Sequence, residues 1–238
     1  RALIKSQNPS NILEVGCGLG RLFKIYSKFP KIEITGIDLS KKMLYIAEKN
    51  YKNIPNKLTL IEKDILKFNT KKTFDMIIIA ASLLKHFKEK HDRMKIINKI
   101  KNLVSKNGII FLDHTPILYY CKNSDWNNAK TSFFRKWSNK PKDLNKYQWK
   151  KKFIEPDIDK LIWRKFENNT EILKTEFTTY YYSISELTQQ LKKENLYYIK
   201  LLDRYEDGVN AVEENYKRFI AIIATNNNIL TKIEKQFH

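Results

Sequence analysis

The chain has 238 residues, 42% hydrophobic and 30% charged, which permits one globular α/β domain with a full core plus an insertion. No stretch approaches about 18 uninterrupted apolar residues, so the sequence predicts no membrane-spanning helix. The formal net charge of +19 is compatible with a polyanionic partner, and the two cysteines and four histidines lack the spacing of a disulfide framework or a metal site.

The first predicted strand ends in an acid and opens into a glycine-rich turn. The run NILEVGCGLG contains the pattern E-x-G-x-G-x-G, at Glu14, Gly16, Gly18 and Gly20. Such a turn allows the backbone to approach a ligand closely. A dinucleotide site would have its third glycine at position 21, where this chain has Arg21, and no P-loop G-K-S/T follows. Because Glu14 would also repel a phosphate, the turn favours a nucleoside-like ligand without one.

The second predicted strand, 33–37, ends at Asp38, where doubly wound sheets place an acid that accepts hydrogen bonds from ribose hydroxyls. The motifs EVGCGLG, GIDLS at 36–40 and KDI at 63–65 together resemble the class I S-adenosylmethionine-dependent methyltransferases. The resemblance implies a Rossmann-like, seven-stranded α/β sheet with an inserted lid and β-hairpin. It also implies S-adenosylmethionine as the cofactor.

The same resemblance implies contacts with the cofactor at several strand ends. The glycine turn would meet the methionine and ribose part, Asp38 the ribose hydroxyls, and Asp64 with Ile65 the adenine amino group. The backbone after the apolar fourth strand, 74–81, would take the cofactor's amino group. The implied cofactor-binding residues are Glu14, Gly16, Cys17, Gly18, Gly20, Asp38, Leu39, Met43, Asp64, Ile65, Ala80, Ala81 and Ser82. Taken singly, Asp38 could instead cap a helix, and Asp64 could start a turn.

Two histidines follow predicted strands at the sheet edge where ligands bind. His86 lies in LLKHF, 83–87, which matches a segment where many small-molecule methyltransferases carry a histidine beside the methyl group. His114 follows the fifth predicted strand, 108–113. Both are candidate catalytic bases, although a lone histidine near a strand end is often a satisfied structural residue.

The segment 114–165 is rich in Trp, Tyr, Lys and Asn and contains three prolines, so it predicts loops and short helices. Two β-rich runs, 161–166 and 171–182, flank a polar turn and predict a hairpin. The hairpin resembles one that covers the acceptor in small-molecule N- or O-methyltransferases. The tyrosines that could line an acceptor pocket, with ordinary packing as the alternative, are Tyr119, Tyr120, Tyr181 and Tyr182.

The remaining residues predict a helix over 185–195 with Ser185 as its N-cap, and a last buried strand over 219–225. Three parts follow: a cofactor-binding core at 1–113, a lid with hairpin at 114–182, and a segment at 183–238 that completes the core. Little chain precedes the first strand for the helices that family members usually carry there. The two cysteines, Cys17 and Cys121, favour a reducing, cytoplasmic setting.

The function favoured by these features is methyl transfer to an N or O nucleophile of a small molecule, such as a sugar, an amine or a natural-product intermediate. Two alternatives stay open. The basic stretch 134–152, with its interleaved aromatic residues, could serve RNA ribose or cap methylation, or the chain could bind the cofactor without catalysis. The lysines are also spread along the whole chain beside Asn and Ile, as an AT-rich coding sequence would produce without selection for binding.

Overall fold

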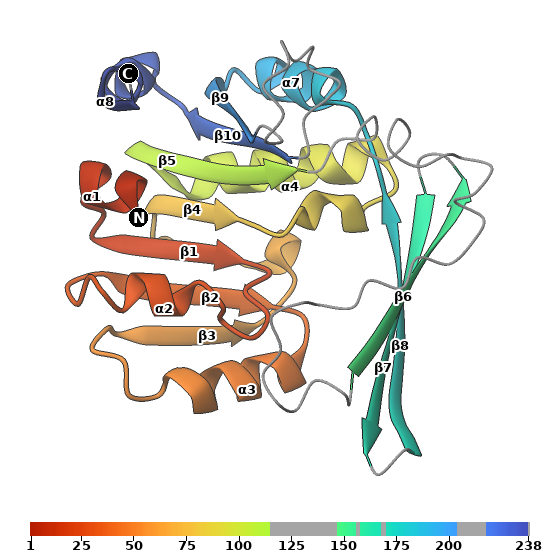
Figure 1. Ribbon diagram of the computed structural model, residues 1–238. Helices are drawn as coiled ribbons and strands as arrows, with labels where there is room; N and C mark the ends of the chain where they lie inside the picture. The colour runs from red at the N-terminus through yellow and green to blue at the C-terminus, as the bar shows by residue number, and fades with distance from the viewer. Residues whose placement is uncertain (115–146, 156–157, 168–169, 204–217, 238) are drawn as a thin grey trace.

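The computed structural model describes residues 1–114, 147–155, 158–167, 170–203 and 218–237. Seven of its strands form one large sheet (Figure 1): β1 (Asn11–Val15), β2 (Glu33–Asp38), β3 (Leu58–Glu62), β4 (Phe74–Ile79), β5 (Val104–His114), β9 (Tyr197–Asp203) and β10 (Arg218–Ala224). Their spatial order is β3-β2-β1-β4-β5-β10-β9. The first five strands are parallel, whereas β10 runs antiparallel to β5 and β9. The predicted Rossmann-like α/β fold is therefore confirmed.

Helices cover both faces of this sheet. One face carries α1 (Ala2–Gln7), α2 (Phe23–Tyr26), α3 (Lys41–Tyr51) and α8 (Asn227–Phe237). The other face carries the 3-10 turns η1 (Ile65–Lys67) and η2 (Leu83–His86) with the helices α4 (Lys90–Leu103) and α7 (Ile184–Lys193). None of the helices in these described ranges has the length and apolar character needed to cross a membrane.

The apolar strands supply both halves of the core. In β4, Met76 and Ile78 pack with the α1–α3 side, while Ile77 and Ile79 pack with the α4 side. This alternation follows from the two-residue period of a strand, and it requires an unbroken apolar run when both faces are covered. Each such side chain, when fully buried, contributes about 1.5–3 kcal/mol to folding.

A second, three-stranded antiparallel sheet consists of β6 (Tyr147–Glu155), β7 (Ile158–Glu167) and β8 (Thr170–Tyr180). It stands beyond the carboxyl ends of the large sheet's parallel strands (Figure 1). β7 and β8 form the predicted hairpin. The prediction of loops and short helices was wrong for 147–155, because β6 pairs with β7, whose free edge offers it a ladder of backbone hydrogen bonds.

The N-cap predicted for the helix after the hairpin was also wrong. Ser183, not Ser185, caps α7: its Oγ accepts a hydrogen bond from Glu186 N at 3.0 Å. The segment from Ser183 to Glu186 reads S-x-x-E, the spacing of a capping box. Ser185 is exposed within the first turn. The predicted last strand corresponds to β10, while β9, α1 and α8 were not predicted.

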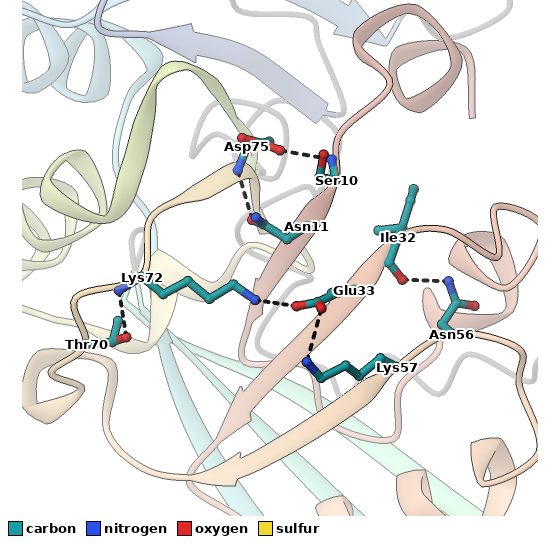
Figure 2. A network of polar contacts seen from close by, with 9 residues as sticks. All are labelled: Ser10, Asn11, Ile32, Glu33, Asn56, Lys57, Thr70, Lys72 and Asp75. Carbon is teal, nitrogen blue, oxygen red and sulfur yellow. Dashed lines mark hydrogen bonds and ion pairs between the residues drawn. The ribbon is translucent and has the colours of Figure 1, made fainter.

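Polar contacts join the strand starts at the amino edge of the large sheet, away from the glycine turn. Asp75 Oδ2 accepts a hydrogen bond from Ser10 N at 2.9 Å, and Asp75 N donates to Asn11 Oδ1 at 3.1 Å (Figure 2). Glu33 pairs there with Lys57 and Lys72. The bond from Ser10 N to Asp75 joins a backbone amide to a carboxylate, as bonds at the carboxyl edge also do, but it lies outside the candidate site.

Candidate cofactor and acceptor site

The glycine turn after β1 has a backbone shape that few other residues could adopt. Gly16, Gly18 and Gly20 have φ values of 68°, 52° and 72°, in the left-handed region that favours glycine. At Gly16, a Cβ atom would also stand 2.8 Å from Leu83 Cδ1. The turn is held against β2, because the amides of Gly16 and Cys17 donate to Ile37 O at 2.8 and 3.0 Å.

Asp38, at the end of β2, holds the same turn. Its Oδ2 accepts a hydrogen bond from Gly18 N and its Oδ1 accepts one from Ser40 N, both at 2.8 Å. Ser40, rather than Asp38, caps α3, since its Oγ accepts from Met43 N at 3.3 Å. An ionised carboxylate offers about four acceptor positions, so these two bonds orient Asp38 and leave capacity for ribose hydroxyls.

Glu14 lies under the turn with a carboxyl oxygen that the described residues leave unsatisfied. The side chain is 4% exposed, and its Oε2 has no hydrogen-bond partner in the described part of the chain. Burial raises the pKa of Glu14 to about 8, with a partial offset from Tyr26 and from the Arg21 charge. A buried, unsatisfied acceptor is costly, which is a physical reason to expect a donor or a cation beside it in the bound state.

The residues around the turn fit S-adenosylmethionine. Leu39, directly after Asp38, is 72% exposed, and Leu19 and Met43 are also exposed apolar side chains. A nucleoside ring would cover such apolar surface, and the sulfonium and ammonium groups of the cofactor suit the unsatisfied oxygen of Glu14. Cys17 is buried within the turn, and burial raises the pKa of its thiol well above the ordinary value, so it packs rather than reacts.

Asp64 and Ile65, expected near the adenine, lie at the end of β3. Asp64 Oδ1 accepts a hydrogen bond from Leu66 N at 2.9 Å and so caps η1, while Ile65 is buried. Asp64 therefore starts a turn, as the alternative interpretation expected, and uses one carboxylate oxygen, Oδ1, to do so. β3 pairs with β2 as far as Glu62, which lies opposite Asp38, so Asp64, two residues further on, is at the same edge of the sheet as Asp38.

The backbone after β4 turns in an unusual way. Ala81 and Ser82 both have positive φ values, 59° and 54°. The Ser82 amide donates to Asp113 Oδ1 at 2.6 Å, and Asp113 is the penultimate residue of β5. Non-glycine residues in the left-handed region are uncommon, and Leu83, which follows this turn, lies against Gly16 of the glycine turn.

His86 ends the short η2 segment and faces the small sheet. Its ring lies edge-on to that of Phe177 in β8, with the centroids 6.3 Å apart. Lys85 is nearly buried, and its Nζ lies 3.6 Å from the centroid of the Tyr181 ring. The segment after β4 therefore joins the carboxyl edge of the large sheet to Phe177 in β8 and to Tyr181 directly after it.

His114 lies in the core and does not face an open surface. It is 0% exposed, its Nε2 lies 2.8 Å from Tyr182 O, and its ring stacks on that of Tyr182 with the centroids 3.9 Å apart. Burial lowers the pKa of His114 to about 3, and the Lys85 and Arg93 charges act in the same direction. A neutral ring in this position donates from Nε2 to the carbonyl, which is a structural role.

The four predicted acceptor tyrosines divide into two groups. Tyr119 and Tyr120 lie outside the described residues. Tyr181 and Tyr182 are 5% and 3% exposed, and the Arg93 guanidinium lies 4.5 Å from the Tyr182 ring centroid. For Tyr182 the structure thus shows packing, the alternative that the sequence left open.

Two buried charged residues of this region were not singled out from the sequence. Arg93 donates to the carbonyls of Phe87 and Lys88 at 2.8 and 2.6 Å and pairs with Glu186 of α7, so it joins the end of η2 to that helix. Asp113 could have been found, because it is an acid at the end of the apolar run GIIFLD. Nothing in the local pattern distinguishes Arg93, which becomes buried only when α7 packs on α4.

Comparisons with known proteins agree with this geometry. Residues 12–108 match the family described as methyltransferase domain. Malonyl-[acyl-carrier protein] O-methyltransferase 1 of Ilyobacter polytropus is 34% identical over 106 residues, which make up 44% of this chain and 38% of that protein. The matched region thus spans about two fifths of that relative's length.

Solved structures match over more of the chain. A S-adenosylmethionine-dependent methyltransferase from Clostridium acetobutylicum is 19% identical with a TM-score of 0.73, over 93% of this chain and 87% of that one. CalS10, an amino pentose methyltransferase from Micromonospora echinaspora solved with the cofactor bound, is 12% identical with a TM-score of 0.64, over 92% and 86%. At these identities the similarity shows the fold. Residues 12–108 therefore match a methyltransferase domain, and the described part of the chain has the fold of S-adenosylmethionine-dependent methyltransferases.

Proposed function

We propose that this protein transfers a methyl group from S-adenosylmethionine to a nitrogen or oxygen nucleophile of a small molecule. The observation that carries the proposal is the glycine turn held by Asp38 above the unsatisfied carboxyl of Glu14, with η2 packed between this turn and β8. Names of similar proteins support it, since one matched relative is an O-methyltransferase and one matched structure an amino pentose methyltransferase.

The chain's own groups have distinct tasks in this proposal. Asp38 accepts hydrogen bonds from the ribose hydroxyls, and Glu14 offers its free oxygen to a positively charged part of the cofactor. When bound, S-adenosylmethionine supplies a methyl group that is already activated by its positive sulfur. The protein must therefore mainly orient the acceptor in line, about 3 Å from that methyl group, and exclude water.

The acceptor side is assigned to η2 and the small sheet. His86 is the retained candidate base, which would take the proton that a hydroxyl or ammonium acceptor must lose. His114 is not retained, because it is enclosed in the core and bonded to Tyr182 O. The small sheet contacts η2 through Phe177, where it would shield the acceptor from water.

Calorimetric titration with S-adenosylmethionine tests the donor half of the proposal. We expect wild type to bind and Asp38→Ala to bind about 10- to 100-fold more weakly, because each hydrogen bond to a charged group contributes about 1.5–3 kcal/mol. Asp38→Asn keeps one oxygen acceptor and should lose less. Asp75→Ala is the matched control: Asp75 also accepts a backbone amide, but at the opposite edge of the sheet (Figure 2). Failure of wild type to bind, or equal binding by Asp38→Ala, would remove the proposal.

Measurements with RNA test the acceptor half. Tight binding to RNA near physiological salt, with a steep loss of affinity as salt rises, would replace the small-molecule acceptor with RNA. Methyl transfer from labelled cofactor to amines, sugars and other small nucleophiles would support the proposal. Cofactor binding without any transfer to either class of acceptor would favour a non-catalytic binding protein.

A further inference from the structure

The turn between β4 and η2 contains two successive non-glycine residues in the left-handed region. Ala81 has φ 59° and Ser82 has φ 54°. For residues with a Cβ this region is sparsely populated, and such a conformation persists only where the surroundings determine it. Because both residues carry a Cβ, they adopt this conformation less readily than glycine would. Another group must therefore stabilise the turn.

Asp113 is placed to hold it. In the parallel pairing of β4 with β5, Ile79 stands opposite Leu112, so Asp113 comes next to the point where the chain leaves β4. Its Oδ1 accepts the Ser82 amide at 2.6 Å, and both residues are buried, at 7% and 9% exposure. A hydrogen bond to a carboxylate is strengthened in such an environment.

The held turn determines where η2 begins. Lys85 N donates to Ser82 O at 2.9 Å, which starts the 3-10 turn directly after Ser82. From η2, Leu83 packs over Gly16 on the cofactor side, and His86 packs edge-on to Phe177 on the acceptor side. A change in the Ala81–Ser82 backbone would therefore shift groups on both sides of the site.

We propose that Asp113 is a positioning residue for methyl transfer, whose carboxylate keeps the Ala81–Ser82 turn left-handed and thereby places Leu83 on the cofactor turn and His86 at the acceptor. The inference rests on the proposed function. It assigns Asp113 no contact with the cofactor or the acceptor; its effect passes through the turn.

A double-mutant cycle separates this role from simple packing. Asp113→Ala is measured in the wild-type background and in the Ser82→Gly background. Glycine adopts positive φ without a steric cost, so the turn should depend less on Asp113 when residue 82 is glycine. A residue that only stabilises the core would cause the same loss in both backgrounds.

Two readouts are used, neither of which needs the acceptor. The first is calorimetric affinity for S-adenosylmethionine, and the second is the NMR signal of the His86 ring, which senses the ring current of Phe177. We expect Asp113→Ala to weaken affinity about tenfold and to move the His86 signal, in line with the loss of a hydrogen bond to a charged group. In the Ser82→Gly background the further loss should be about twofold. Asp113→Asn, which keeps an oxygen acceptor, should stay within about threefold of wild type.

The outcomes separate the two proposals. If wild type fails to bind the cofactor, the proposed function fails. If wild type binds, but folded Asp113→Ala keeps the wild-type affinity and His86 signal, or its loss is equal in both backgrounds, only the role of Asp113 is overturned. Should Asp113→Ala not fold, hydrogen exchange of the Ser82 amide in Asp113→Asn decides: faster exchange than in wild type is expected, and unchanged exchange overturns the role. Asp75→Ala, which removes a matched bond at the other edge, should leave both readouts unchanged.

Discussion

Glu14 shows how one residue can link folding to pH. Its pKa is raised to about 8 in the folded chain, against 4.5 in an unfolded one, so the folded state binds the proton more tightly. The contribution of Glu14 to stability is therefore complete below about pH 4.5 and is lost as pH rises toward 8, where the buried group must ionise. The buried carboxyl of Glu14 thus lowers the stability of the folded chain at neutral and alkaline pH.

Replacing Glu14 by glutamine should remove this pH dependence. We expect Glu14→Gln to gain on the order of 1–3 kcal/mol over wild type at pH 9, and little or nothing at pH 4.5, as measured by urea unfolding. Glu33→Gln is a contrasting control, because hydrogen bonds from Lys72 and Lys57 lower the pKa of the exposed Glu33. A gain for Glu14→Gln that is the same at both pH values would contradict the assignment.

His114 should behave in the opposite way on the pH scale. Its pKa is about 3 in the folded chain, whereas an unfolded histidine titrates near 6.5. Its contribution to stability is therefore complete above pH 6.5 and is lost as pH falls toward 3. An NMR titration should show no change of the His114 ring between pH 8 and 5, but titration near 6.5 once the chain is unfolded in urea. A midpoint near neutral pH in the folded protein would contradict its structural role.

Among the elements, α7 gives the most direct test of local structure. Ser183→Ala should cost about 1 kcal/mol, because the Glu186 amide loses its cap. Ser185→Ala, two residues later at an exposed position, should cost no more than about 0.5 kcal/mol. Urea unfolding of both variants decides between the two serines, and an equal loss would contradict the cap assignment.

The elements that were predicted correctly are those with strong local signals. The apolar run of β4, the glycine turn, the acid that ends β2 and the hairpin of β7 and β8 could all be found from residue type and spacing. β6 could not, since its lysine-rich pattern becomes a strand only by pairing with β7. The burial of Arg93 and His114 likewise depends on contacts made by α7 and Tyr182, which are distant in the sequence. The three-part domain division and the role of His86 stay predictions.

At the scale of the whole molecule, cofactor binding should appear as a gain in thermal stability. A ligand at 100 times its Kd stabilises a fold by about 2.7 kcal/mol, which corresponds to a rise in Tm of about 5–10 °C for a chain of this size. We expect that rise for wild type with S-adenosylmethionine. Asp38→Ala should show a much smaller rise at the same concentration, and the same rise in both would contradict the assigned site.

The stacked pair of His114 and Tyr182 has a consequence for how this protein can diversify. The chain leaves β5 at His114 and returns after β8, and these two residues bond and stack at the start and the end of that excursion. This contact holds together the two points at which the chain leaves the large sheet and returns to the core. We therefore expect changes in the length and sequence of the small sheet, β6 to β8, to leave the large sheet intact. On the proposed function, such changes would alter the acceptor without altering the binding of the methyl donor.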